Sequence, residues 1–177
     1  MLRSLRFAAV CLAFSALACP LRGQQPQTPG PEMEVLEKSL GTWDCEIKIP
    51  GGETTKGEAV YKKGPGGLWV VSSFKGAFGP TEFEGHGVDG YDQGKQKYVS
   101  VWVDSMSSAP TIFEGDFDAD TKTMTMLGEA KAPGGQTVKF KNVTKIKDAD
   151  HQTFTMAVVG SDGQAVPMMT IEYTRRK

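Results

Sequence analysis

Cysteine is scarce in this 177-residue chain, and the scarcity excludes two ways of stabilising a small domain. Of the three cysteines, Cys11 and Cys19 lie within the first 19 residues, so Cys45 is the only one in the remainder of the chain. A single thiol cannot form a disulfide framework within the chain or supply a cysteine-rich zinc site. The domain must therefore be stabilised by an ordinary hydrophobic core.

Long apolar runs are equally scarce, because residues 7–19 form the only one. This run of 13 residues follows Arg3 and Arg6 and ends in small side chains. It is shorter than the roughly 20 residues that a membrane-spanning helix needs. The pattern predicts a secretory signal over residues 1–19 and an exported protein without a membrane span, located in the periplasm, in the cell envelope or outside the cell.

The end of the signal allows two routes of processing. Ala16-Leu17-Ala18 fits the A-x-A site of signal peptidase, which predicts a free mature protein. Leu17-Ala18-Cys19 resembles a bacterial lipobox, although Ala16 stands where leucine is usual. In this second route Cys19 is acylated and carries a lipid anchor.

An excess of basic residues is also missing. Removal of residues 1–23 takes away three arginines and no acid, which leaves 17 basic and 21 acidic residues and a net charge of −4. A mildly acidic surface argues against nucleic acid as a partner.

The chain divides into a tether and one folded domain. Residues 20–32 contain four prolines and three glutamines without apolar periodicity, which indicates a disordered linker. Residues 33–40 place apolar side chains on one side of a helix of about two turns that Gly41 stops. The remaining length suits a single domain, residues 33–177.

From Gly41 onward the apolar period is two, which is typical of strands. Short turns rich in glycine, proline and aspartate separate ten such segments. They cover residues 41–49, 54–63, 67–75, 82–91, 97–104, 110–118, 122–131, 136–147, 151–159 and 166–175.

No helical stretch is long enough for a parallel crossover, so the pattern predicts an antiparallel meander. A sheet of ten hairpin-linked strands either closes on itself or exposes two edges. We therefore predict an all-β fold, an up-and-down barrel of about ten strands with a short N-terminal helix over one mouth. The alternatives are a two-sheet sandwich, which needs long connections, and an open sheet, which needs a partner to cover it.

Two sets of residues resemble known families. Gly41-Thr42-Trp43 is similar to the start of lipocalin-like proteins (calycins), in which the Trp lies across the closed end of the barrel under an Arg from near the C-terminus. This resemblance implies that Gly41, Trp43 and either Arg175 or Arg176 close the barrel, the arginine through cation-π stacking.

More specific are the segments GHGVDGYDQGKQKYVSVWVDSM, residues 85–106, and MMTIEYTRRK at the C-terminus. They resemble the bacterial domain-of-unknown-function family 1579, and the resemblance covers residues 33–177. It implies a calycin-type barrel and no established activity.

The segment 97–104 is the strongest source of site residues. One face of it is purely aliphatic, and the other carries Tyr98, Ser100, Trp102 and Asp104. Ligand cavities are largely apolar with a few placed polar groups, so we expect the second face to line the lumen and bind the ligand. The alternative is that these aromatics belong to the surface or core and that Asp104 begins a turn.

His86 lies between Gly85 and Gly87 on the neighbouring segment, and three hypotheses apply to it. It is a hydrogen-bonding residue of the cavity, an axial ligand to haem as in the related nitrobindin-like barrels, or a surface histidine. The first is our expectation, so no cofactor or metal is predicted and haem stays the alternative.

Acidic residues recur beside glycines, as in Gly57-Glu58, Glu84-Gly85, Glu114-Gly115 and Gly128-Glu129. Inward glutamates would make an acidic cavity that prefers a cation, whereas a structural pattern has glycine at the bend and glutamate in water. We favour the structural pattern. Asp89 and Asp92 flank Gly90-Tyr91 and are assigned to a hairpin turn.

These observations predict an exported barrel that binds a small, largely apolar molecule without catalysis. One alternative is an isomerase or hydrolase that uses His86 and a carboxylate as an acid-base pair. Another is an envelope interaction protein whose lumen is filled by its own side chains. The volume of the cavity separates the last hypothesis from the other two.

Overall fold

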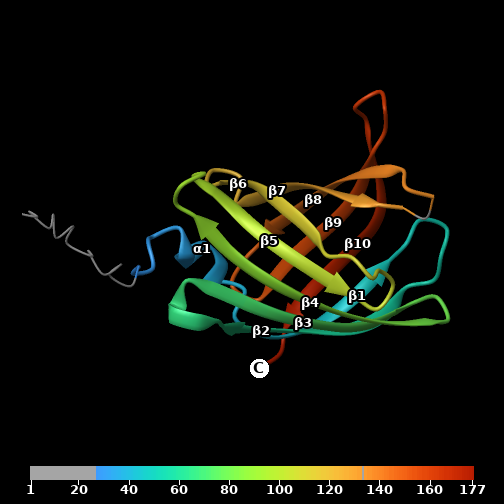
Figure 1. Ribbon diagram of the computed structural model, residues 1–177. Helices are drawn as coiled ribbons and strands as arrows, with labels where there is room; N and C mark the ends of the chain where they lie inside the picture. Colours follow the sequence, from blue (N-terminus) through green and yellow to red (C-terminus); the bar gives the residue numbers. More distant parts are fainter. Residues whose placement is uncertain (1–26, 133) are drawn as a thin grey trace, which may run out of the picture.

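Ten strands form a closed antiparallel barrel in the computed structural model, which describes residues 27–132 and 134–177 (Figure 1). Consecutive strands are paired, and β1 also pairs with β10 to close the sheet. The predicted signal, its cleavage site and Cys19 lie outside the described residues. None of the helices in the described part of the chain is long and apolar enough to cross a membrane.

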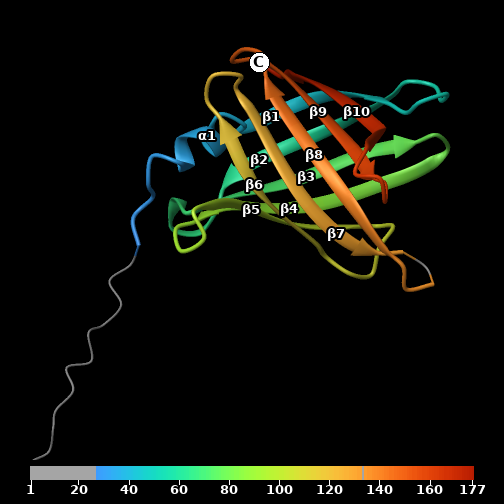
Figure 2. The same cartoon turned by 90° about the horizontal axis from the view of Figure 1, so that it is seen from above.

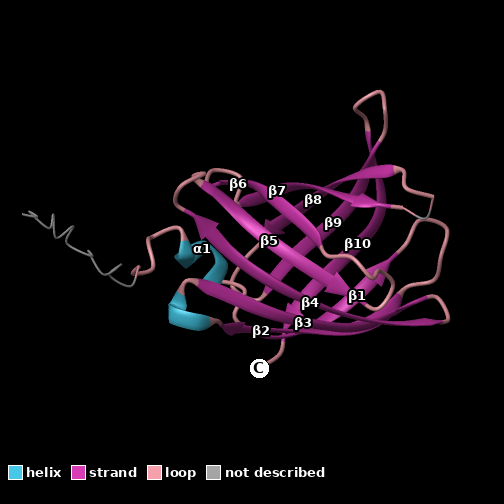
Figure 3. Cartoon of the chain, in the orientation of Figure 1, coloured by secondary structure: helices cyan, strands magenta, loops and turns pink. Residues whose placement is uncertain are grey.

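The barrel wall consists of β1 (Gly41–Lys48), β2 (Thr55–Lys63), β3 (Trp69–Phe78), β4 (Thr81–Asp92), β5 (Lys97–Asp104), β6 (Thr111–Asp118), β7 (Thr123–Lys131), β8 (Thr137–Ile146), β9 (His151–Val159) and β10 (Ala165–Arg175). Two short helical segments, α1 (Met33–Glu37) and the 3-10 turn η1 (Pro65–Gly67), lie at the same end of the barrel (Figure 3). The ten predicted strands and their up-and-down order are thus confirmed.

Several predicted boundaries differ from the structure by one to three residues, and two of them have a clear local cause. The helix ends at Glu37, and a turn connects it to β1, so Gly41 is the first strand residue and not the helix stop. The third strand begins at Trp69, because η1 occupies the preceding Pro65–Gly67. In the predicted linker, residues 27–30 have no regular secondary structure and residues 31 and 32 form a turn.

The packed core follows from the alternation on β1, where Trp43, Cys45 and Ile47 are buried and their neighbours are exposed. Side chains from β2, β3, β4 and β10 complete the cluster. Burial is also the main cause that raises the pKa of the Cys45 thiol to about 12, so this cysteine is a structural residue. The core therefore lies against one side of the barrel wall.

The end of the barrel beside α1 is closed by Trp43 and Arg175. The guanidinium carbon of Arg175 lies 4.1 Å from the centre of the Trp43 ring, within the range of a cation-π contact. Trp43 Nε1 donates a hydrogen bond to the Ser39 carbonyl, at 2.7 Å. Arg175 also donates to the carbonyls of Lys38, Leu40 and Ala149. Each polar group of this plug has a partner.

Gly41 and Arg176 have different roles at this end. Gly41 has a φ of +119°, and a Cβ there would lie 2.9 Å from an Arg175 guanidinium nitrogen. A side chain at this position would therefore be strained and would displace the arginine. Arg176 instead forms exposed ion pairs with Asp44 and Glu58, so the arginine over Trp43 is Arg175 alone.

The opposite end is formed by the hairpins that join β1 to β2, β3 to β4, β5 to β6, β7 to β8 and β9 to β10 (Figure 2). The Tyr98 hydroxyl, near the start of β5, donates a hydrogen bond to the Glu32 carbonyl beside α1, at 3.1 Å. The start of β5 therefore lies at the closed end, so β5 runs away from that end and its antiparallel neighbour β4 runs toward it. Asp104 at the end of β5 consequently lies in the open half of the barrel.

Candidate ligand-binding cavity

The lumen contains a cavity of about 630 Å³ that extends from α1 to the hairpins of the open end. Val35 and Leu36 border it at one end, and Met106 and Ala132 border it at the other. Nine aromatic side chains line it, namely Tyr61, Phe74, Phe78, Phe83, Trp102, Phe113, Phe140, Phe154 and Tyr173. The barrel is not filled by its own side chains, so the filled-barrel hypothesis is wrong.

Trp102 lies flat against β4 because that strand has glycines beneath the ring. A Cβ at Gly85 would overlap the indole, and one at Gly87 would lie 3.3 Å from Trp102 Cε3. The indole is also parallel to the Phe83 ring, with 6.4 Å between centroids and 14° between planes. These glycines therefore serve to admit Trp102, and they do not mark His86.

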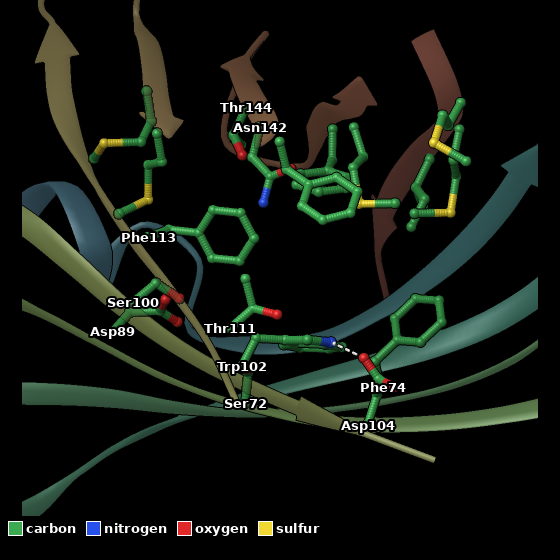
Figure 4. Close-up of a pocket in the computed structure, with 18 of the residues that line it drawn as sticks. Ser72, Phe74, Asp89, Ser100, Trp102, Asp104, Thr111, Phe113, Asn142 and Thr144 are labelled. Atoms are coloured by element: carbon green, nitrogen blue, oxygen red, sulfur yellow. Dashed lines mark hydrogen bonds between the residues drawn. The ribbon is translucent and has the colours of Figure 1, made fainter. Parts of the chain in front are cut away.

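Asp104 is held in place by two hydrogen bonds. Its Oδ2 accepts from Trp102 Nε1 at 2.9 Å (Figure 4), and its Oδ1 accepts from the Met106 backbone at 2.8 Å. One carboxylate thus orients the ring and also ends the strand.

Asp89 is the second carboxylate on this wall. It lies opposite Ser100 in the β4–β5 pair, and Figure 4 shows the two side chains next to each other. Burial raises the pKa of Asp89 from 3.8 to about 6, against the opposing effect of the hydrogen bond with Ser100. At neutral pH this carboxyl is charged at a considerable cost.

Tyr61 and Tyr173 form a hydrogen-bonded pair in the same half of the barrel. Burial raises the pKa of each above its ordinary value, and the Asp89 carboxylate adds to the rise in both. The two hydroxyls are therefore neutral hydrogen-bonding groups at physiological pH.

The wall formed by β7, β8 and β9 is made largely of flexible apolar side chains. Met124, Met126 and Met156 line it, and methionine adapts its shape to irregular contacts. Asn142 lies among them on β8, and its Oδ1 is the one buried side-chain nitrogen or oxygen atom of the described residues that has no hydrogen-bond partner.

Three of the five predicted ligand-binding residues line the cavity, namely Ser100, Trp102 and Asp104. Tyr98 lies on the same face of β5 but beyond the cavity, at the closed end, where its ring packs edge to face on Tyr91. That face of β5 therefore lines the cavity from Ser100 to Asp104 and packs beside α1 at Tyr98.

His86 is not a cavity residue. It is exposed on the outer face of β4, between Ser73 on β3 and Val103 on β5. The expectation that it points into the lumen is wrong, because strand alternation that buries Gly85 and Gly87 turns it outward. A haem in the lumen could not be ligated by His86, and an acid-base pair between His86 and a lumen carboxylate does not form.

The glutamates beside glycines also face outward. Glu58, Glu84, Glu114 and Glu129 each form an ion pair on the outer surface, with Arg176, Lys75, Lys95 and Lys139 respectively. Their arrangement agrees with the structural interpretation. Within the described residues no group of three or more His, Cys, Asp or Glu side chains could hold a metal ion.

The family model described as a protein of unknown function (DUF1579) matches residues 28–175. The chain belongs to the DUF1579 family. A search of the curated proteins finds no match for this family member.

Two solved structures share the fold. The crystal structure of Rv2717c from M. tuberculosis has a TM-score of 0.61 at 12% identity, over 84% of this chain and 99% of that chain. The S-type phycobiliprotein lyase CPES from Guillardia theta has a TM-score of 0.52 at 10% identity, over 81% of this chain and 92% of that chain. Both similarities support a lipocalin-like barrel for this DUF1579 protein.

Asp89 was missed as a cavity residue because Gly90 and Asp92 nearby suggest a turn. The structure continues β4 through Asp92, whose Oδ1 caps the turn by accepting from the backbone of Gly94 and Lys95. Alternation from the buried Phe83 places Asp89 on the lumen side. Continuing the two-residue alternation of a strand from Phe83 through Gly85 and Gly87 in the sequence would have placed Asp89 on the lumen side.

Proposed function

We propose that this DUF1579 protein is an exported carrier that holds a small, largely apolar molecule in its lumen without catalysing a reaction. The unfilled cavity of about 630 Å³ supports this function most strongly. Cavities of 300–1,000 Å³ with apolar walls and few polar groups are typical of small-molecule sites.

Three further observations support a binding role. The rings of Trp102 and Phe83 form a rigid stacked wall, and the methionines of β7 and β9 face the cavity as adaptable side chains. The barrel fold is shared with a protein named as a phycobiliprotein lyase, which supports use of the lumen for a small molecule. The signal that the sequence predicts over residues 1–19 supports a location outside the cytoplasm, and in the second processing route Cys19 would carry a lipid anchor.

The test is a fluorescence titration with N-phenyl-1-naphthylamine, a neutral apolar probe whose emission rises in an apolar site. The protein without residues 1–23 is expected to bind one probe molecule per chain. Thr144 on β8 lines the cavity, so Thr144→Phe fills the lumen and is expected to weaken binding at least tenfold.

Val143 provides a matched control, because the same strand turns it to the outer face. Val143→Phe adds a ring of equal size there and is expected to leave binding unchanged. Equal probe binding by the two variants would overturn the proposed function, as would the absence of binding to the original protein.

A further inference from the structure

Asp89 has no cationic partner in the part of the chain that the structure describes. The groups that face it are the Ser100 hydroxyl from β5 and the phenols of Tyr61 from β2 and Tyr173 from β10. Val70, its neighbour on β3, is apolar. A half-buried carboxylate on a largely apolar cavity wall, with one hydroxyl partner, is poorly compensated.

Other carboxylates of the barrel have partners within the protein. Glu84, Asp116 and Glu172 lie on the outer face, and each has a lysine within ion-pair distance. Asp104, the other carboxylate of the cavity, accepts two hydrogen bonds. Asp89 is therefore the carboxylate of the lumen that is available to pair with a cationic group of a ligand.

The rest of the cavity favours a positive group on the ligand. Aromatic faces attract cations, and Trp102 and Phe113 line the same cavity as Asp89 (Figure 4). Lys131 is the only lysine or arginine among the described residues of the lining, and it ends β7 at the open end. Asp89 lies in the closed half, three residues before the end of β4.

A second polar atom in the barrel wall has no hydrogen-bond partner. Asn142 Oδ1 on the β8 wall is an acceptor, is buried and has no partner. Buried acceptors without donors are uncommon in folded proteins. Because this oxygen is fully buried and Figure 4 shows the amide nitrogen of Asn142 directed into the cavity, Asp89 is the acceptor that an N–H group of a ligand can reach.

We propose that the ligand carries a basic nitrogen on an apolar body and that Asp89 is its counter-ion. This inference rests on the proposed function, since it requires that the lumen hold an apolar molecule. The ammonium group lies in the closed half of the barrel against Asp89, and the apolar body extends past Trp102 toward the open end.

The experiment is displacement of bound N-phenyl-1-naphthylamine by three compounds of equal chain length at pH 7.5: n-decylamine, n-decanol and decanoate. For the original protein, decylamine is expected to displace the probe at a concentration at least tenfold below that of decanol, and decanoate is expected to be weakest. In Asp89→Asn the advantage of the amine over the alcohol is expected to disappear, while displacement by decanol stays within about twofold.

Glu84→Gln is the matched control, because it removes a carboxylate from the outer face of the same strand and is expected to retain the preference for the amine. Decanol displacement reports in each variant whether the lumen is intact, and Asp89→Ser serves as a second neutral variant if Asp89→Asn fails this check. Equal displacement by decylamine and decanol in the original protein overturns the inference and leaves the proposed function standing. A preference that persists in Asp89→Asn and Asp89→Ser removes Asp89 from the site. Failure of the probe itself to bind overturns the proposed function.

Discussion

Polar groups at the closed end of the barrel all have hydrogen-bond partners, whereas polar groups of the lumen wall are paired only in part. At the closed end, Arg175 stacks on Trp43 and donates to three backbone carbonyls, and the indole nitrogen has its own acceptor. In the lumen, Asp89 has only a hydroxyl partner and Asn142 Oδ1 has none. Complete pairing stabilises a fold, whereas unpaired groups in a cavity lower stability and leave binding capacity for a ligand.

The largest effect is expected from removal of the plug. Trp43→Ala deletes a side chain that is 1% exposed and also its contact with Arg175, so the free energy of unfolding should fall by about 3–5 kcal/mol. Urea denaturation followed by far-UV circular dichroism measures the change. Val101→Ala on the outer face is the control, with a change of no more than about 0.5 kcal/mol expected. A similar loss in both variants would contradict the role of the closed end.

Asp89→Asn should increase the free energy of unfolding, and the size of this increase should depend on pH. The pKa of Asp89 in the folded state, about 6, is raised above its ordinary value of 3.8, so the folded state retains the proton to higher pH. The contribution of Asp89 to stability therefore decreases as pH rises from about 4 to 6 and stays unfavourable above that range. Asp89→Asn should be more stable than the original protein by about 2 kcal/mol at pH 7.5 and closer to it at pH 4.

Urea midpoints of the two proteins at pH 4, 5, 6 and 7.5 provide the measurement. The comparison between them removes the contribution of the paired surface carboxylates, because both proteins share these groups. A stability difference between the two proteins that does not change with pH would contradict a raised pKa of Asp89 in the ligand-free folded protein.

A smaller effect is expected from a substitution at Gly85, which leaves room for the Trp102 indole. Gly85→Ala places a methyl group against the indole, which must move into the cavity, and the overpacking should cost about 1–2 kcal/mol. Probe binding should weaken at the same time. Gly52→Ala is the control, because the nearest atom to its Cβ would be 3.5 Å away. Unaltered binding in Gly85→Ala would exclude Trp102 from the site.

The fold was predictable because its signals are local. The alternation of Trp43, Cys45 and Ile47 predicts the buried face of β1, and the turns between segments predict the hairpin order. The face of β5 that carries Trp102 was also predictable, since it differs in chemistry from the aliphatic face. These patterns need no knowledge of distant contacts.

The site was predictable only in part. Glycines have no side chain to mark a face, so Gly85 and Gly87 concealed that His86 points outward and Asp89 inward. The open volume between Trp102 and the methionines of β7 and β9 depends on how opposite walls are spaced, which no local pattern reports. Whether Arg175 or Arg176 covers Trp43 likewise depended on the register of β10 against β1, which places Arg175 opposite Trp43.

The most direct measurement is mass spectrometry of what the protein retains when it is purified from its native host. The original protein is expected to release an apolar compound with a basic nitrogen, at close to one molecule per chain, and Thr144→Phe is expected to release none. Recovery of no compound, or of the same compound from Thr144→Phe, would contradict a binding role for the lumen. Recovery of a neutral or acidic compound would preserve the carrier and contradict Asp89 as its counter-ion.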